Sequence, residues 1–401
     1  MDIYYHSDRF RQLLRRYEAL QHGDIGELPD PEELTDVAEY YHTVGEDGKA
    51  MEAADYAVRM YPTATAPVAF KSRMALLTDD NPQLAGEIAE TIVDKSDLDY
   101  LYLKAEIMVA GGDAAAADRF LQAHYDETVD PDDLEDYILD VAALFSDYEE
   151  TDYAEKWLKR STMTEDRDYK ELHAHILRNH GRYEESEAIL NDLLDTDPYS
   201  GPYWNQLAQN QFLRDDIQDS ITSSEYSIAI NPDDEEAVLN KANGLFTLGN
   251  YEESLKFYER YKQLCPHQDT SIIDVTIGHI RLMQGQAVEA QRCYRQALSE
   301  SKNKPLTLVH IGISAFDNGY VEYAYRIFIN LLPETDDEWD IGFAYLARCC
   351  YELKKEKEYK LFLRKAVERN PEECVEVLSD LFPEGTSPQD YLTAGFRAQD
   401  E

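Results

Sequence analysis

Basic residues are scarce in this sequence. Its 401 residues include 38 Lys and Arg against 81 Asp and Glu, which gives a formal net charge of −43. Binding to nucleic acids requires clustered Lys and Arg that neutralise phosphates, and docking on an anionic membrane surface requires them too. The composition therefore argues against direct binding of nucleic acid or of a membrane surface. A basic partner is the electrostatically permitted kind.

Long apolar runs are also missing. No segment approaches the roughly 18 consecutive apolar residues of a membrane-spanning helix, and residues 1–9 lack the basic start and apolar run of a secretory signal. The sequence has only five cysteines, an odd number, which is typical of free thiols in a reducing compartment. We therefore expect a cytoplasmic protein, and the 43% of hydrophobic residues are enough for a folded core.

Motifs for catalysis and metal binding are absent as well. The sequence has no G-x-x-x-x-G-K-[ST] phosphate loop, no H-E-x-x-H and no C-x-x-C. His173 and His175 are two residues apart, which places them on different faces of a helix, and they favour surface histidines over a metal site. Cys349 and Cys350 favour core packing over redox sensing. We therefore expect no catalytic residues, no metal and no cofactor, and hence no enzyme.

What the sequence does have is an internal repeat. Pro198, Pro232 and Pro266 are each 34 residues apart, and Gly181–Ser186 and Gly249–Ser254 differ at one position only. Extending this register in both directions gives about ten units. They start near residues 31, 65, 98, 134, 167, 201, 235, 271, 305 and 340.

Each unit has the pattern of two helices joined by a turn. Places four, seven, eight and eleven are apolar or small, as in Leu34, Val37, Ala38 and Tyr41, and this spacing forms one face of a helix. A Gly or polar turn follows near place fifteen, and a second helix carries a small residue near place twenty. Pro near place thirty-two ends the second helix, because Pro lacks an N–H and clashes with the preceding turn. The pattern predicts antiparallel helix pairs.

These places resemble those of the tetratricopeptide repeat. The matching residues in the two clearest units are Trp204, Leu207, Ala208 and Pro232, and Gly278, Ala290, Tyr294 and Ala297. The resemblance covers residues 31–371 and is most specific over 167–371. It implies an all-α, right-handed superhelical solenoid whose first helices line a concave groove.

The repeat register divides the chain into four predicted segments. Residues 1–30 hold an N-terminal capping helix, with Phe10, Leu13, Leu14 and Tyr17 on one side. Residues 31–166 hold degenerate repeats, 167–371 well-matched repeats, and 372–401 a C-terminal capping helix and a loose tail.

Side-chain amides mark the groove that the resemblance implies. Asn205 and Gln209 share a helix face, as do Asn240 and Asn243. Gln209 and Asn243 are one period apart, and His279 and Arg348 occupy the same place in later units. A row of amides offers donors and acceptors to an extended peptide backbone, and some superhelical members of the resembling family use groove asparagines in this way. The alternative is that these residues are ordinary surface amides.

The same family also binds acidic chaperone tails with a clamp that includes Lys at place five. None of the ten units has Lys at that place. The sequence therefore departs from the clamp pattern, and its acidity would repel such tails.

Acidity leaves two interpretations open. Residues 1–166 hold 39 acidic and 14 basic residues, a net charge of −25. The charge either keeps an elongated array soluble or attracts basic segments. We expect a non-enzymatic scaffold that binds a protein or extended peptide in its groove at Asn205, Gln209, Asn240, Asn243, His279 and Arg348. The alternative is an acidic regulator or decoy that occupies a basic nucleic-acid-binding surface of another protein.

Overall fold

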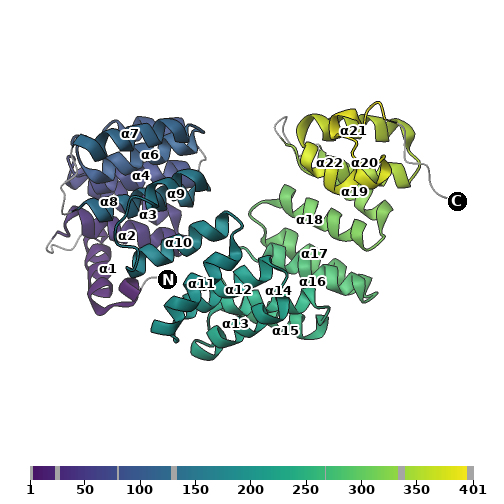
Figure 1. Cartoon of the computed structure of the whole chain (residues 1–401), viewed down its shortest axis with the longest axis horizontal. Helices are drawn as coiled ribbons and strands as arrows, with labels where there is room; N and C mark the ends of the chain where they lie inside the picture. The colour runs from purple at the N-terminus through teal and green to yellow at the C-terminus, as the bar shows by residue number, and fades with distance from the viewer. Residues whose placement is uncertain are drawn as a thin grey trace. The chain divides into compact units, whose positions relative to one another are not determined.

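Helices build the whole described part of the chain. The computed structural model describes residues 3–22, 28–78, 81–127, 133–266, 268–332 and 339–394, and these residues contain no β-strand. Figure 1 shows the helices following one another as antiparallel neighbours. They form ten pairs between an N-terminal and a C-terminal helix, which confirms the predicted all-α repeat fold.

The first helices of the pairs contain the Leu, Ala and Gly places of the sequence pattern. They are α2 (Pro31–Thr43), α4 (Thr65–Leu77), α6 (Leu98–Ala110), α8 (Leu134–Asp147), α10 (Arg167–Asn179), α12 (Gly201–Leu213), α14 (Glu235–Thr247), α16 (Ser271–Met283), α18 (Lys304–Asp317) and α20 (Phe343–Glu352). The second helices are α3 (Asp47–Met60), α5 (Pro82–Ala89), α7 (Ala114–Glu127), α9 (Thr151–Leu158), α11 (Tyr183–Thr196), α13 (Ile217–Ile230), α15 (Tyr251–Leu264), α17 (Ala287–Glu300), α19 (Val321–Leu331) and α21 (Glu356–Arg369).

The repeat register places the first helices correctly. The first eight begin at the residue that the register predicts, and α18 begins one residue early. The last, α20, begins three residues late, because Gly342 precedes it in the left-handed conformation with φ of 84°. A left-handed residue cannot form part of a right-handed α-helix, so α20 starts at the next residue, Phe343.

In nine of the ten pairs, the described turn contains a left-handed residue. Gly181 and Gly249 have φ of 71° and 75° there, and four further glycines do the same at the predicted turn place. Glycine adopts this conformation without the steric cost of a Cβ atom. Three pairs use Glu149, Asp215 and Lys354 instead, with φ of 59°, 67° and 58°.

The chain divides into two compact units. The N-unit comprises residues 1–240 and the C-unit comprises residues 241–401, so the division falls inside α14. The four segments predicted from the sequence were defined by how closely each part matches the repeat pattern, whereas the two units are defined by compactness. The four segments therefore stay a prediction.

The N-unit begins with a helix that covers the first pair. After the short 3₁₀ segment η1 (Ile3–His6), Ser7 is the N-cap of α1 (Asp8–Gln21), and its Oγ accepts a hydrogen bond from the Phe10 backbone N–H at 3.1 Å. Phe10, Leu13 and Tyr17 are buried in one cluster with α2 and α3. This helix covers apolar surface that the end of a stacked array would otherwise expose.

The C-unit ends with a similar cover. Helix α22 (Pro371–Leu378) follows α21 and continues into the 3₁₀ segment η3 (Ser379–Leu381). After η4 (Pro388–Asp390), Tyr391 is 3% exposed and its ring stacks on Phe382 at a centroid distance of 4.0 Å. The tail beyond residue 394 lies outside the described residues. Among the described residues, no helix has both the length and the apolar character of a membrane span.

Candidate functional site

Two of the predicted groove residues lie together on α12 and bond to the start of α14. Asn205 is 3% exposed, and its Nδ2 donates to the Asp234 carboxylate oxygens at 3.0 and 3.2 Å. Gln209 donates from Nε2 to Glu236 Oε1 at 2.6 Å. Its own Oε1 accepts from Arg178 Nη1 at 2.7 Å. Gln209 thus bridges a cation on α10 and a carboxylate on α14.

The same row of contacts continues onto α10 and α8. Arg178 Nη2 lies 2.8 Å from His175 Nδ1. Burial lowers the pKa of His175, Arg178 lowers it further, and Asp147 at the end of α8 opposes both. Burial also lowers the pKa of Arg178. Side chains from four successive first helices of the N-unit therefore interact across one face, which we call the first-helix face.

The first-helix face extends to the N-terminal repeats. Arg73 on α4 donates from Nε to Glu106 on α6 at 2.9 Å. Glu39 on α2 has its pKa raised by burial and by Asp36, while Arg73 lowers it. Tyr5 in η1 donates to Glu39 at 3.4 Å. Each contact joins one first helix to the next or to the N-terminal segment.

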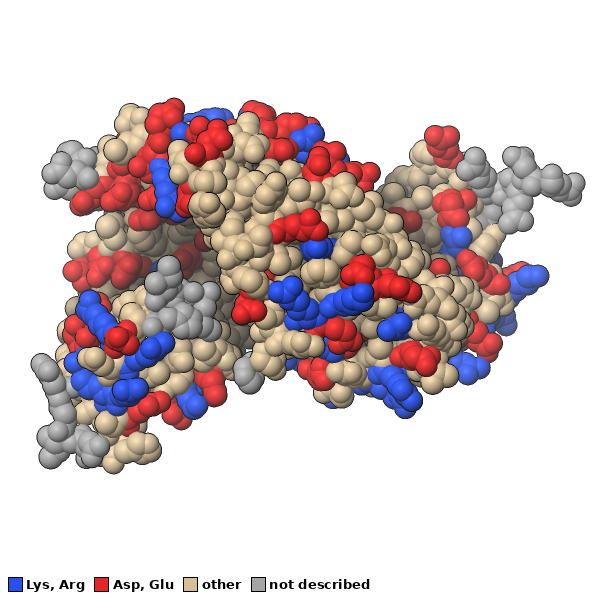
Figure 2. Space-filling view, turned by 90° about the horizontal axis from the view of Figure 1, so that it is seen from below, with Lys and Arg blue, Asp and Glu red and all other residues tan. Residues whose placement is uncertain are grey.

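Four carboxyl groups of this face have raised pKa values, and we call them the inner row: Glu39, Asp140, Asp147 and Glu236. Desolvation is the largest cause for each of them. Glu39 is half-buried, whereas solvent reaches the other three. Protein atoms around them thus replace part of their hydration while leaving them accessible. In Figure 2, red acidic side chains border the hollow at the left of the visible face.

Among the residues that the structure describes, the inner row has no direct cationic partner. Asp140 accepts a hydrogen bond from the Tyr102 hydroxyl at 3.0 Å, and Glu236 accepts bonds from Asn205 and Gln209. Within the described ranges, none of the four forms a salt bridge. Titratable groups that are desolvated and accessible on one face are candidates for a functional site.

The remaining predicted amides lie on α14, one in each unit. Asn240 is the last residue of the N-unit, and its Nδ2 is buried without a hydrogen bond among the described residues. Asn243 belongs to the C-unit and accepts a hydrogen bond from the Tyr258 hydroxyl at 2.8 Å. Its carbonyl oxygen is therefore engaged within its own helix pair.

His279 and Arg348 are both bonded inside the C-unit. His279 Nδ1 lies 3.0 Å from Ser314 Oγ, and burial lowers its pKa although Asp317 opposes this. Arg348 donates to Glu352 at 3.0 Å, to the Val377 carbonyl at 3.2 Å and to Asp380. Both side chains are held by neighbouring helices of the C-unit. Their predicted role toward a peptide stays a prediction.

Two helix pairs of the C-unit pack through a close contact between a glycine and an aromatic ring. A Cβ atom added to Gly312 on α18 would lie 2.6 Å from Cζ of Phe328 on α19, and one added to Gly278 on α16 would overlap Cε1 of Tyr294 on α17. The small residue at place eight of the first helix thus receives the aromatic ring at place twenty-four of the second. This fit recurs at the 34-residue period.

The pairs thus have the two-helix packing that the resemblance to the tetratricopeptide repeat implies. No family model matches this chain, and no curated protein matches it. Solved structures do resemble it. MamA is 16% identical over 46% of this chain and 96% of its own, with a TM-score of 0.35. The Cut9–Hcn1 hetero-tetramer of the APC/C is 15% identical over 92% of this chain and 88% of its own, with a TM-score of 0.36.

A tetratricopeptide repeat protein from Parabacteroides merdae is 16% identical over 71% of this chain and 98% of its own, with a TM-score of 0.43. These TM-scores are low, so the description of the repeat fold rests on the helices of this chain and their own packing.

The sequence contains a signal for the acidic part of the face. Glu39, Arg73 and Glu106 are 34 and 33 residues apart, so they occupy one place of three successive repeat units. A comparison of the charged residues at the same place of successive repeats identifies these three residues. Without that comparison they do not stand out, because acidic residues are abundant throughout the sequence. Arg178 and Glu236 were missed because their link through Gln209 is visible only in three dimensions.

Three of the five cysteines have unreactive thiols. Cys349, Cys350 and Cys374 are buried, and desolvation raises the pKa of each thiol to about 12. A thiol is nucleophilic as its thiolate, so these three are unreactive near neutral pH. The interpretation of Cys349 and Cys350 as core residues agrees with their burial.

Proposed function

We propose that the chain is a non-enzymatic scaffold that binds an extended basic peptide or protein segment on the first-helix face of its N-unit. The observation that carries the proposal is the inner row: four carboxyl groups that are desolvated, accessible to a ligand and without a salt bridge among the described residues.

Electrostatics favours a cationic ligand at these groups. A carboxylate that has lost part of its hydration is destabilised, which is why its pKa rises. A Lys or Arg side chain that reaches it forms a charge-assisted hydrogen bond, and such bonds are stronger where protein atoms have displaced water. The face is largely preformed by stacked helices, so most of the ordering cost falls on the ligand.

Amides supply the second part of the proposal. Asn205 Oδ1 and Asn240 Nδ2 are buried without hydrogen bonds among the described residues, so a ligand cannot reach these two atoms directly. Asn205 and Gln209 instead hold Glu236 in place. The proposal thus assigns the positioning of the inner row to the amides of the N-unit, and charge recognition to the inner row itself.

A charge-matched pair of variants tests this proposal. The inner variant combines Glu39→Gln, Asp140→Asn and Asp147→Asn. The control variant neutralises three exposed acids of second helices, with Glu52→Gln, Asp195→Asn and Asp219→Asn. A fluorescent peptide of five Lys-Gly units is the probe, and its Glu-Gly counterpart is the ligand control. We measure the affinity of both variants by fluorescence anisotropy.

We expect the inner variant to lose about tenfold in affinity for the Lys-Gly peptide, since three interactions of roughly 0.5 kcal/mol each are removed. The control variant should lose less than twofold. Equal losses would contradict a defined site, because they would show that only net charge attracts the peptide. That outcome, together with competition by DNA for a basic partner protein, would favour the acidic decoy instead.

A further inference from the structure

A groove lies at the C-terminal end of the C-unit. It has a volume of about 870 Å³ and is bordered by the end of α20, the first half of α21 and residues 382–394. This volume is in the range of ligand-binding sites. All of its lining belongs to one compact unit, and none of it belongs to the first-helix face of the N-unit.

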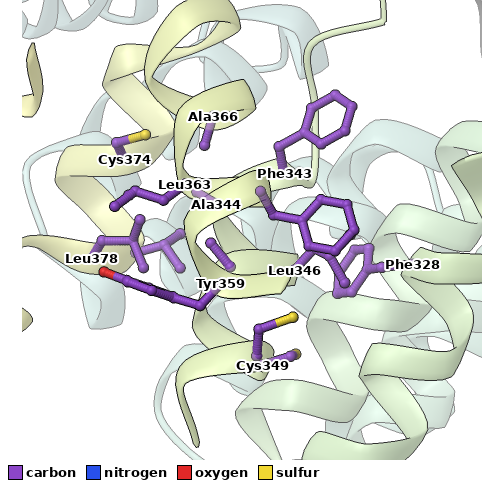
Figure 3. Packing of buried hydrophobic residues seen from close by; sticks show 14 of the residues in the cluster. Phe328, Phe343, Ala344, Leu346, Cys349, Tyr359, Leu363, Ala366, Cys374 and Leu378 are labelled. Carbon is purple, nitrogen blue, oxygen red and sulfur yellow. The ribbon is translucent and has the colours of Figure 1, made fainter. Parts of the chain in front are cut away.

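The floor of the groove is apolar. Leu363, Phe382, Tyr391 and Leu392 line it. Figure 3 shows Leu363 on α21 together with Tyr359, within the buried cluster that supports the groove. Leu363, Phe382 and Tyr391 are at most 3% exposed, whereas Leu392 is 43% exposed. An aliphatic or aromatic side chain of a ligand would therefore contact Leu392, above a buried apolar layer.

The rim carries positive charge in an otherwise acidic chain. Lys354, Lys355, Lys360 and Arg364 line the groove, and of the two lining acids Glu352 is already bonded to Arg348 at 3.0 Å. Lys355 lies 3.5 Å above the Tyr325 ring. Lys360 and Arg364 are exposed one helical turn apart, with no salt bridge in the part of the chain that the structure describes.

Sequence composition shows the same local reversal of charge. Residues 354–365 contain six basic and two acidic residues, whereas the whole chain contains 38 basic and 81 acidic residues. A surface of this kind attracts anionic ligands and repels cationic ones.

We propose that this groove binds a short acidic peptide segment of a partner protein, anchored by one aromatic or aliphatic side chain on the apolar floor. The rim cations bind the carboxylates that flank the anchor. A second copy of this chain is a poorer occupant, because two molecules with a charge of −43 repel each other. The site differs from the proposed site of the N-unit in location and in charge, so either can fail without the other.

Substitutions on α21 test the proposal with the full chain. The probe is a fluorescent peptide of sequence Asp-Glu-Phe-Asp-Glu-Leu, and the peptide with Ser at both apolar positions tests the anchor. The rim variant is Lys360→Glu with Arg364→Glu. The control is Lys357→Glu with Arg292→Glu, two exposed residues of the same unit that do not line the groove.

We expect the rim variant to bind the acidic peptide at least tenfold more weakly, the control less than threefold more weakly, and the Ser peptide at least fivefold more weakly. Affinity for the Lys-Gly peptide should not fall in either variant. No binding by the unsubstituted chain, or equal losses in both variants, would overturn the proposal. Self-association that the rim variant abolishes would also overturn it, in favour of a second copy.

Lys354 provides a readout that a purely structural role would not give. It holds a left-handed φ of 58° where most pairs have Gly. Lys354→Gly should therefore raise the melting temperature, because glycine relieves the strain, and should weaken acidic-peptide binding about threefold. Unchanged binding by this stabilised variant would contradict a role for Lys354 in the groove.

Discussion

Single residues explain why neighbouring helices approach so closely. Gly278 and Gly312 leave room for the rings of Tyr294 and Phe328, which are 3% and 2% exposed. Tyr294 is further fixed by its hydroxyl, 2.7 Å from Ser314 Oγ. An added Cβ atom would lie within 3.0 Å of either ring, so the glycines are required by packing rather than by backbone conformation.

The packing predicts a specific cost for a single methyl group. Gly278→Ala should lower the free energy of unfolding by about 1–3 kcal/mol, because the Cβ atom overlaps the fixed Tyr294 ring. Urea unfolding followed by circular dichroism measures it. Gly48→Ala is the matched control, since nothing lies within 4 Å of its added Cβ atom. A neutral Gly278→Ala would show that the ring shifts freely.

The desolvated carboxyl group of Glu39 predicts that the stability of the fold depends on pH. The pKa of Glu39 is raised in the folded chain, so its contribution to stability is fully present at low pH and is lost as pH rises through the folded pKa. Glu39→Gln should therefore raise the melting temperature at neutral pH and change it little below about pH 4, where Glu39 is protonated. Thermal unfolding at both pH values measures this, with Glu52→Gln as control. A lower melting temperature at neutral pH would contradict the desolvation of Glu39.

At the scale of the helices, the sequence predicted most of what the structure shows. The 34-residue period and the turn places set the starts of the first helices, because apolar spacing and left-handed turns act locally. The lengths of the second helices were harder to predict. Helices α5 and α9 have only eight residues, in repeats whose pattern is degenerate. Neither repeat has a Pro near place thirty-two to mark the end of its second helix.

The turns between paired helices give an element-scale prediction. Asp215 has φ of 67° at a place where other pairs have Gly. Asp215→Gly should stabilise the chain by about 1 kcal/mol, since the left-handed conformation costs a residue with a Cβ atom roughly that much. The reverse change, Gly249→Asp, should destabilise by a similar amount. Unfolding in urea compares the two, and equal effects of one sign would refute the account of the turn.

At the scale of the whole molecule, charge is distributed unevenly. The inner row lies on first helices of the N-unit, while the basic run of residues 354–365 lies at the end of the C-unit. The sequence predicted Asn205 and Gln209 on one face, and the structure brings them together around Glu236. It did not predict the inner row, because desolvation depends on residues from several repeats. It also gave no sign of the division at residue 240, since α14 continues through it.

The most direct test of the proposed function is the affinity of the unsubstituted chain for the Lys-Gly peptide as a function of pH. The inner-row carboxyl groups have raised pKa values in the free chain, and a bound cation lowers them, so binding releases protons. We expect affinity to rise as pH increases from about 4 to 7, with a flatter profile for the inner variant. An affinity that is independent of pH, or a profile that the inner variant leaves unchanged, would contradict binding at the inner row.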